Sequence, residues 1–80
     1  MTDDIEPQVV EFIRGIRPTN TGADASTDLI MTGMLDSLAI LELVDFVAKR
    51  FSVTVPARDL LPANFRTART VTALIRARSQ

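Results

Sequence analysis

Apolar residues recur at helical spacing in three stretches of this chain. Near the N-terminus they stand at i, i+4, i+7, i+8 and i+11, which places them on one face of an α-helix. This spacing predicts a helix over residues 4–16, with Thr2, Asp3 or Asp4 as its cap and Pro18 beyond its end. Its inward residues are Ile5, Val9, Phe12, Ile13 and Ile16.

The second apolar stripe predicts a helix over residues 37–50 with an unusual outer face. At 100° per residue, Leu38 falls on the polar side and Leu41 near the boundary, so both are expected to be exposed. Single exposed apolar residues are common, but two beside one serine favour a contact function. The inward residues are Ile40, Leu43, Val44, Val47 and Phe51.

The stretch that follows alternates like a strand but is interpreted as an extended connector. One isolated strand would have no partner in so small a domain, whereas Val53 and Val55 can still enter the core. A short helix is expected over residues 57–61, ended by Pro62. Phe65 is expected to anchor the loop that comes next.

A last helix is predicted over residues 67–78, with Thr67 as its N-cap. The 80 residues are 46% hydrophobic, which suffices for one modest core. The predicted fold class is therefore all-α: one domain, residues 1–80, formed by three main helices and one short helix. The inward stripe of the last helix is Ala68, Val71, Leu74 and Ile75.

Residues 17–36 connect the first two helices without clear periodicity. A connection this long in a compact domain is either functional or contains a short turn of its own. Leu29, Ile30 and Met31 are expected to hold it against the core.

The composition disfavours autonomous catalysis. The chain has no Cys and no His, hence no thiol, no thiolate metal site and no imidazole to activate a serine. Its one lysine, Lys49, lies about three helical turns beyond Ser37. A serine hydrolase is therefore disfavoured, no metal site is expected, and chemistry at Ser37 would come from another protein.

No part of the sequence predicts membrane insertion or export. There is no apolar run long enough to span a bilayer, and the N-terminus carries Asp3, Asp4 and Glu6 where targeting segments carry bases. We therefore expect a cytoplasmic protein with no membrane partner.

Charge is distributed unevenly. Residues 1–48 hold nine acids and two bases, a balance of −7, and residues 49–80 hold one acid and seven bases, a balance of +6. Either the halves attract each other across the fold, or they form two docking surfaces of opposite sign. A small DNA-binding or adaptor domain is the alternative function, opposed by the acidic excess. Its phosphate-binding residues would be Arg66, Arg69, Arg76 and Arg78.

A short motif stands where the polar loop meets the second helix: Gly33-Met34-Leu35-Asp36-Ser37-Leu38. With it, the chain resembles the acyl and peptidyl carrier protein family over nearly its whole length. Helix lengths and the Val-Pro connector are in register with the motif, which alone would recur by chance. The matching stretches are residues 33–38, 41–44, 51, 53–56, 60–67, 71 and 74–75.

The resemblance implies that Ser37 receives 4′-phosphopantetheine from coenzyme A through a separate phosphopantetheinyl transferase. The terminal thiol of that arm would carry acyl groups as thioesters. Asp36 matches a residue of the transferase recognition surface. The alternative is that Asp36 or Ser37 is only an N-cap, and capping can coexist with modification. Further positions that partners recognise in the family match Leu38, Leu41, Glu42 and Asp45.

Departures from the family pattern indicate which kind of carrier this chain resembles. Fatty-acid carriers are strongly acidic along the second helix, whereas Lys49 and Arg50 close it here, and the Gly-Gly pair of many peptidyl carriers is absent. Residues 61–65 are closer to free-standing carriers of specialised pathways, and a start at Met1 agrees with that. The resemblance implies a monomeric acyl or aminoacyl carrier of a polyketide or nonribosomal peptide type pathway. Its partners would be the transferase, a loading enzyme and downstream synthase enzymes, with no nucleic acid.

Overall fold

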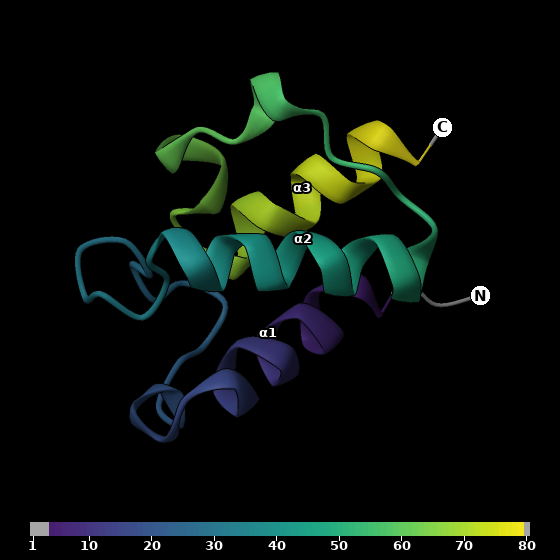
Figure 1. Cartoon of the computed structure of the whole chain (residues 1–80). Coiled ribbons are helices and arrows are strands. Elements are labelled where there is room, and N and C mark those ends of the chain that lie inside the picture. The colour runs from purple at the N-terminus through teal and green to yellow at the C-terminus, as the bar shows by residue number, and fades with distance from the viewer. Residues whose placement is uncertain (1–3, 80) are drawn as a thin grey trace.

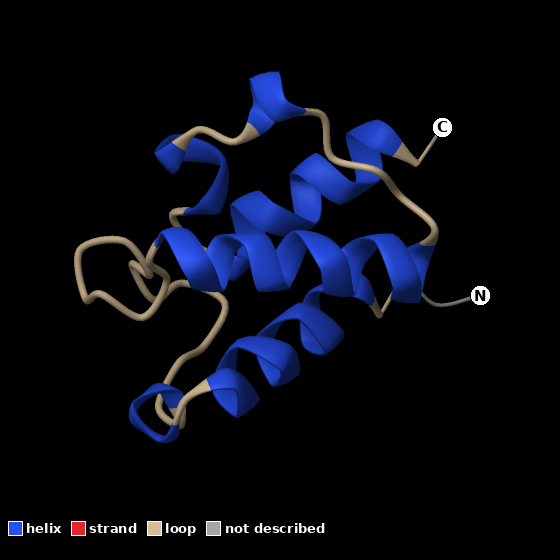
Figure 2. Cartoon of the chain, in the orientation of Figure 1, coloured by secondary structure: helices blue, strands red, loops and turns tan. Residues whose placement is uncertain are grey.

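The computed structural model describes residues 4–79 of the chain. Its three α-helices are α1 (Ile5–Ile16), α2 (Ser37–Phe51) and α3 (Ala68–Arg78). Short 3₁₀ turns occupy the connections, and residues 4–79 contain no strand (Figures 1 and 2). The predicted all-α fold class, a small helical bundle of three main helices, is confirmed, and 3₁₀ turns stand in place of the one short helix expected. The turns are η1 (Pro18–Asn20), η2 (Ala57–Asp59) and η3 (Pro62–Phe65).

The core draws on all three helices and on the segments between them. In Figure 1, α2 crosses the middle of the molecule with α1 below it and α3 above. Burying a branched or aromatic side chain contributes about 1.5–3 kcal/mol, so a set of this size supports one small core. The buried apolar residues are Val9, Ile13, Ala23, Leu29, Leu35, Ala39, Leu43, Val47, Val53, Val55, Phe65, Ala68, Val71 and Ile75.

The connector after α2 is extended and buries Val53 and Val55, as the alternating pattern predicted. The next turns differ from the expectation. The helix expected over residues 57–61 is a single 3₁₀ turn that ends at Asp59. Pro62 opens η3, because its fixed φ suits the first position of a helical turn. Phe65 is buried, but it belongs to this turn and not to a loop.

Loop 17–36 contains η1 and a series of hydrogen-bonded bends. Leu29 is fully buried and Ile30 half-buried, but Met31 is 82% exposed, so its predicted role in the core is wrong. The carboxylate of Asp28 accepts the N–H groups of both Ile30 and Met31. This tight Asx-type turn leaves Ile30 against the core and places Met31 at the surface.

The start of α1 lacks the side-chain cap expected from its acidic residues. Asp4 is the N-cap residue, but its side chain accepts no backbone N–H of the first turn. Its carboxylate accepts the side-chain amide of Gln8 at 3.3 Å instead. The other two candidate caps, Thr2 and Asp3, lie outside the described residues.

Helices α1 and α2 meet through aromatic side chains. The rings of Phe12 and Phe46 stack with their centroids 4.3 Å apart, and Phe51 meets Phe46 edge-on at 5.9 Å. Such ring pairs add to the stabilisation from burial alone. They hold the far end of α2 against α1, while its first residues remain accessible. Among residues 4–79, no helix combines the length and apolar composition needed to cross a membrane.

Candidate functional site

Ser37 is the first residue of α2, and its side chain is exposed. The N–H groups in the first turn of a helix have no acceptor within the helix. Asp36 supplies one: it is the N-cap, and its Oδ1 accepts the N–H of Ala39 at 2.9 Å. Because Asp36 does the capping, the Ser37 hydroxyl is not needed for it and makes no hydrogen bond within residues 4–79.

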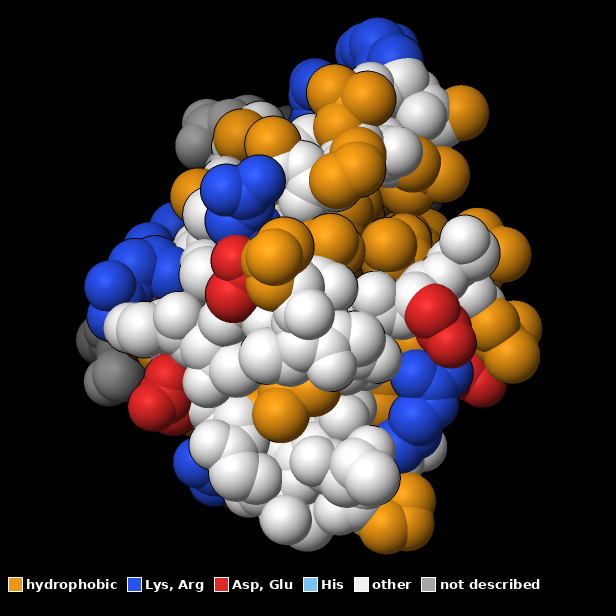
Figure 3. Space-filling model, turned by 90° about the vertical axis from the view of Figure 1, so that its left-hand side faces the viewer, with side chains coloured by type: hydrophobic (Ala, Val, Ile, Leu, Met, Phe, Trp, Pro, Cys, Tyr) orange, Lys and Arg blue, Asp and Glu red, His pale blue; other side chains and the backbone are white. Residues whose placement is uncertain are grey.

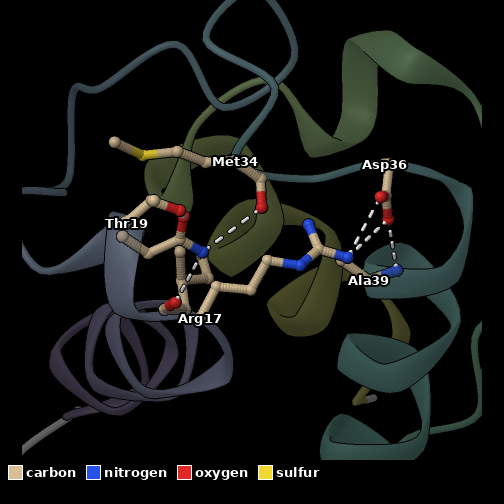
Figure 4. A network of polar contacts seen from close by, with 7 residues as sticks. Arg17, Thr19, Met34, Asp36 and Ala39 are labelled. Carbon is tan, nitrogen blue, oxygen red and sulfur yellow. Dashed lines mark hydrogen bonds and ion pairs between the residues drawn. The ribbon is translucent and has the colours of Figure 1, made fainter.

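Arg17 contacts the same carboxylate from the end of α1 (Figure 4). Its Nη2 lies 3.0 Å from both oxygens of Asp36. The N–H of Ala39 and then the Arg17 guanidinium hold the pKa of Asp36 below its ordinary value. The carboxylate beside Ser37 is therefore ionised at neutral pH and fixed in one position by two elements of the fold.

A buried asparagine positions the segment that leads into the motif. Asn20, in η1, is fully buried, and its side-chain amide donates to the carbonyl of Ile13 at 2.9 Å and to that of Met34 at 3.3 Å. It thus ties the last turn of α1 to the chain two residues before Asp36. Figure 4 shows this network next to the Arg17–Asp36 pair.

Loop 17–36 is also tied to the C-terminal part of the chain. The N–H of Leu29 donates to the carbonyl of Arg66 at 2.6 Å, and the N–H of Arg69 donates to the carbonyl of Ala25 at 3.2 Å. Leu35, which is buried, donates its own N–H to the carbonyl of Leu29 at 3.0 Å. Gly33 lies between them with φ of +77°, a conformation that glycine adopts without steric cost.

The remaining predicted site residues lie on the exposed face of α2. Leu38 is 62% and Leu41 56% exposed, as the helical pattern predicted. Glu42 and Asp45 are exposed beside them, and Asp45 pairs with Lys49 at 3.1 Å. All five predicted recognition positions, Asp36 included, therefore lie along the first three turns of one helix.

Two further apolar side chains, which the sequence did not predict to be exposed, lie at the surface elsewhere in the fold. Met31 in loop 17–36 and Leu61 before η3 are 82% and 55% exposed. Figure 3 shows hydrophobic side chains gathered across the upper part of the face that carries this loop and the start of α2. Large exposed side chains on neighbouring segments are typical of a contact surface.

Sequence reasoning found Ser37 and Asp36 but missed Arg17 and Asn20. One signal for Arg17 was available, because it is one of only two bases in the acidic first 48 residues. Asn20 gave none, since an asparagine after Pro-Thr is equally typical of an exposed turn. Within residues 4–79, no acidic side chains are grouped so that they could hold a metal ion.

Comparison with known protein families gives a match over most of the chain. A sequence profile of the family described as "Phosphopantetheine attachment site" matches residues 8–76. The chain therefore belongs to the phosphopantetheine-binding carrier family, whose covalent cofactor is 4′-phosphopantetheine, and the resemblance seen in the sequence is confirmed. Members of this family are carriers and not catalysts themselves.

A curated relative is the probable acyl carrier protein PigG from Serratia sp. (strain ATCC 39006). The two sequences are 37% identical over 54 residues, which cover 68% of this chain. The match spans 62% of the relative's length, less than two thirds of that protein.

The start of α2 fits a phosphodiester chemically. Ser37 offers an exposed hydroxyl, and the N–H groups of Ser37 and Leu38 have no acceptor within residues 4–79. Free N–H groups and the helix dipole favour an anion at this end of a helix. The guanidinium of Arg17 adds positive charge one residue away, at Asp36.

Proposed function

We propose that this chain is an acyl or aminoacyl carrier protein whose 4′-phosphopantetheine is attached to Ser37. The observation that carries the proposal is the division of roles at the start of α2. Asp36 caps the helix through Ala39, which leaves the neighbouring serine hydroxyl exposed and uncommitted. Within residues 4–79, no base is bonded to that hydroxyl, which supports modification by a separate transferase.

When bound, 4′-phosphopantetheine supplies the thiol that holds a carried unit as a thioester. This suits a chain without cysteine. The residues of the chain itself would present and orient the attachment point. Ser37 would form the phosphodiester, Asp36 would hold the first turn of α2 and be recognised by the transferase, and the rigid contacts of Asn20 would fix the approach of the chain.

The partner surface is proposed to be the exposed face of α2. It offers two apolar side chains, Leu38 and Leu41, flanked by the carboxylates of Glu42 and Asp45. Apolar residues surrounded by charge are typical of surfaces that bind several partners in turn, since charge steers the encounter and apolar contact holds it. The expected partners are the transferase, a loading enzyme and downstream synthase enzymes.

A specialised biosynthetic pathway is the proposed setting. The helix that partners would recognise has Lys49 and Arg50 in its last turn, so its charge changes sign toward its C-terminal end. A partner adapted to a uniformly acidic helix would meet repulsion there. The relative's printed name, a probable acyl carrier protein, supports acyl cargo for this chain.

The attachment is tested by intact mass after incubation with coenzyme A, magnesium and a promiscuous phosphopantetheinyl transferase. Wild type should gain one phosphopantetheinyl group, and Ser37→Ala should gain none. Ser26→Ala is the matched control, because Ser26 is another exposed serine, in the loop before α2. Its replacement should not change the gain in mass. Failure of wild type to react with several transferases would refute the attachment.

The DNA-binding alternative is less well supported by the arrangement of the arginines. Arg78 is held by Asp59 in a two-pronged ion pair at 2.6 and 3.1 Å, and Arg69 lies 3.7 Å from Glu6. Arg69 and Arg78 thus already face carboxylates. Salt-dependent retention on DNA would favour it again.

A further inference from the structure

Attachment of a phosphodiester to Ser37 would create a local excess of negative charge. Ser37 follows Asp36 directly, and neighbouring Cα atoms are about 3.8 Å apart. The Asp36 carboxylate is ionised at neutral pH. Like charges carried by adjacent residues repel each other, and a cation beside them lowers that repulsion. This inference rests on the proposed attachment at Ser37.

Arg17 is the base positioned to compensate that charge. The first 48 residues contain only one other base, Arg14, whose Nε donates to the carbonyl of Ala23 at 2.6 Å. Lys49 and Arg50 lie twelve and thirteen residues further along α2. At 1.5 Å per residue this is about 18 Å or more along the helix axis, beyond the screening length in ordinary buffers.

The Arg17 guanidinium has capacity for a second acceptor. Only Nη2 is engaged by Asp36, while Nε and Nη1 have no partner within residues 4–79. The side chain is 31% exposed, so it is reachable from solvent yet held by its ion pair. A guanidinium carries five donors in a rigid fork that matches the oxygens of carboxylates and phosphates.

We propose that Arg17 binds the phosphodiester formed on Ser37 while remaining paired with Asp36. One guanidinium would then bridge the carboxylate and the phosphate and join the end of α1 to the root of the arm. The arm would leave the protein at a defined point beside α1. The modified protein would also keep the Arg17–Asp36 contact that joins the two ends of loop 17–36.

The experiment compares the melting temperature, Tm, of the unmodified and modified forms of each variant. Comparing the two forms within one variant cancels the effect of losing the Arg17–Asp36 pair itself. At low salt, modification should lower the Tm of Arg17→Gln by about 2–5 °C more than it lowers that of wild type. The difference should shrink toward zero in about 1 M NaCl, where charges are screened within roughly 3 Å.

Two variants serve as controls. Arg17→Lys keeps the positive charge and should recover part of the difference. Arg14→Gln removes the other base of the acidic half and should respond to modification as wild type does. Equal changes in wild type and Arg17→Gln at low salt would overturn the proposal.

A second readout uses the side-chain Nε–H resonance of Arg17 in the NMR spectrum of the full chain. It should shift when Ser37 is modified, whereas an unchanged resonance would contradict the contact. This measurement decides the matter in wild type even if Arg17→Gln does not fold. If wild type gains no mass, the attachment itself is refuted; if it gains mass and the resonance does not move, only the role of Arg17 is refuted.

Discussion

Side chains around the start of α2 hold the local structure in place and leave the Ser37 hydroxyl accessible. Asp36 caps the helix and pairs with Arg17, Asn20 holds the preceding segment, and Ser37 keeps an exposed hydroxyl. The sequence predicted that a helix starts at Ser37 and offered Asp36 as one of two candidate caps, because a motif and a helix start coincide there. Arg17 and Asn20 act across 19 and 14 residues, and a long-range hydrogen bond leaves no trace in local spacing.

Replacing Asn20 tests its role as a positioning residue. In Asn20→Ala the carbonyls of Ile13 and Met34 lose their shared donor in a buried place, which should lower the free energy of unfolding by about 1–3 kcal/mol. Urea denaturation measures this loss. Thr21→Ala, at the exposed next position, should change stability by less than about 0.5 kcal/mol. Equal stability of both variants would show that the asparagine contacts contribute little.

The helices were easier to predict than the segments between them. Each α-helix has a long apolar stripe, and Thr67 at the start of α3 was predicted as its cap. The turns η2 and η3 occupy a stretch with two prolines, where no window is long enough to show a period. There the structure is set by proline geometry and by Phe65 reaching the core, not by a repeating pattern.

Removing the cap of α3 tests the best-defined helix start. The hydroxyl of Thr67 accepts the N–H of Thr70 at 3.0 Å, and the hydroxyl of Thr70 accepts the N–H of Thr67 at 3.1 Å. Thr67→Ala should cost about 1 kcal/mol, which lowers Tm by about 4–8 °C in a domain of this size. Thr67→Ser keeps the hydroxyl and should stay close to wild type. Equal Tm values for Thr67→Ala and Thr67→Ser in a thermal melt would argue against the reciprocal cap.

Across the whole molecule, some of the unevenly distributed charges form ion pairs between the acidic and basic halves of the chain. Glu6 of α1 lies 3.7 Å from Arg69 of α3, so the acidic and basic halves do meet. Arg58 and Arg66 are exposed as well, so part of the basic half remains accessible for docking. Composition alone could not separate these interpretations, because it does not say which residues the fold brings together.

Stability should fall in acid through carboxylates bonded in the folded state. Hydrogen bonds from Ser26 and Thr27 lower the pKa of Asp24, and those from Ala39 and Arg17 lower that of Asp36. A carboxyl with a lowered folded pKa stabilises the fold fully above its ordinary value of 3.8, and the contribution is lost as pH falls below it.

The corresponding measurement is the urea midpoint between pH 6 and pH 2.5. Wild type should lose stability over the lower part of this range. The double variant Asp24→Asn, Asp36→Asn should start lower at pH 6 and lose less, because two of the titrating carboxyls are gone. If both proteins lose stability in parallel, other groups govern the acid transition.

The hydrogen bonds that join Leu29 to Arg66 and Arg69 to Ala25 also have a consequence for biosynthesis. The segment that delivers Ser37 cannot take its final shape until the chain has been translated through residue 69. At roughly 5–20 residues per second, these 32 residues take about 2–6 s to synthesise. Until then the serine lacks the finished surroundings that these hydrogen bonds provide. A transferase that recognises the folded surface would thus act only on completed molecules, and the modification would itself report that folding has succeeded.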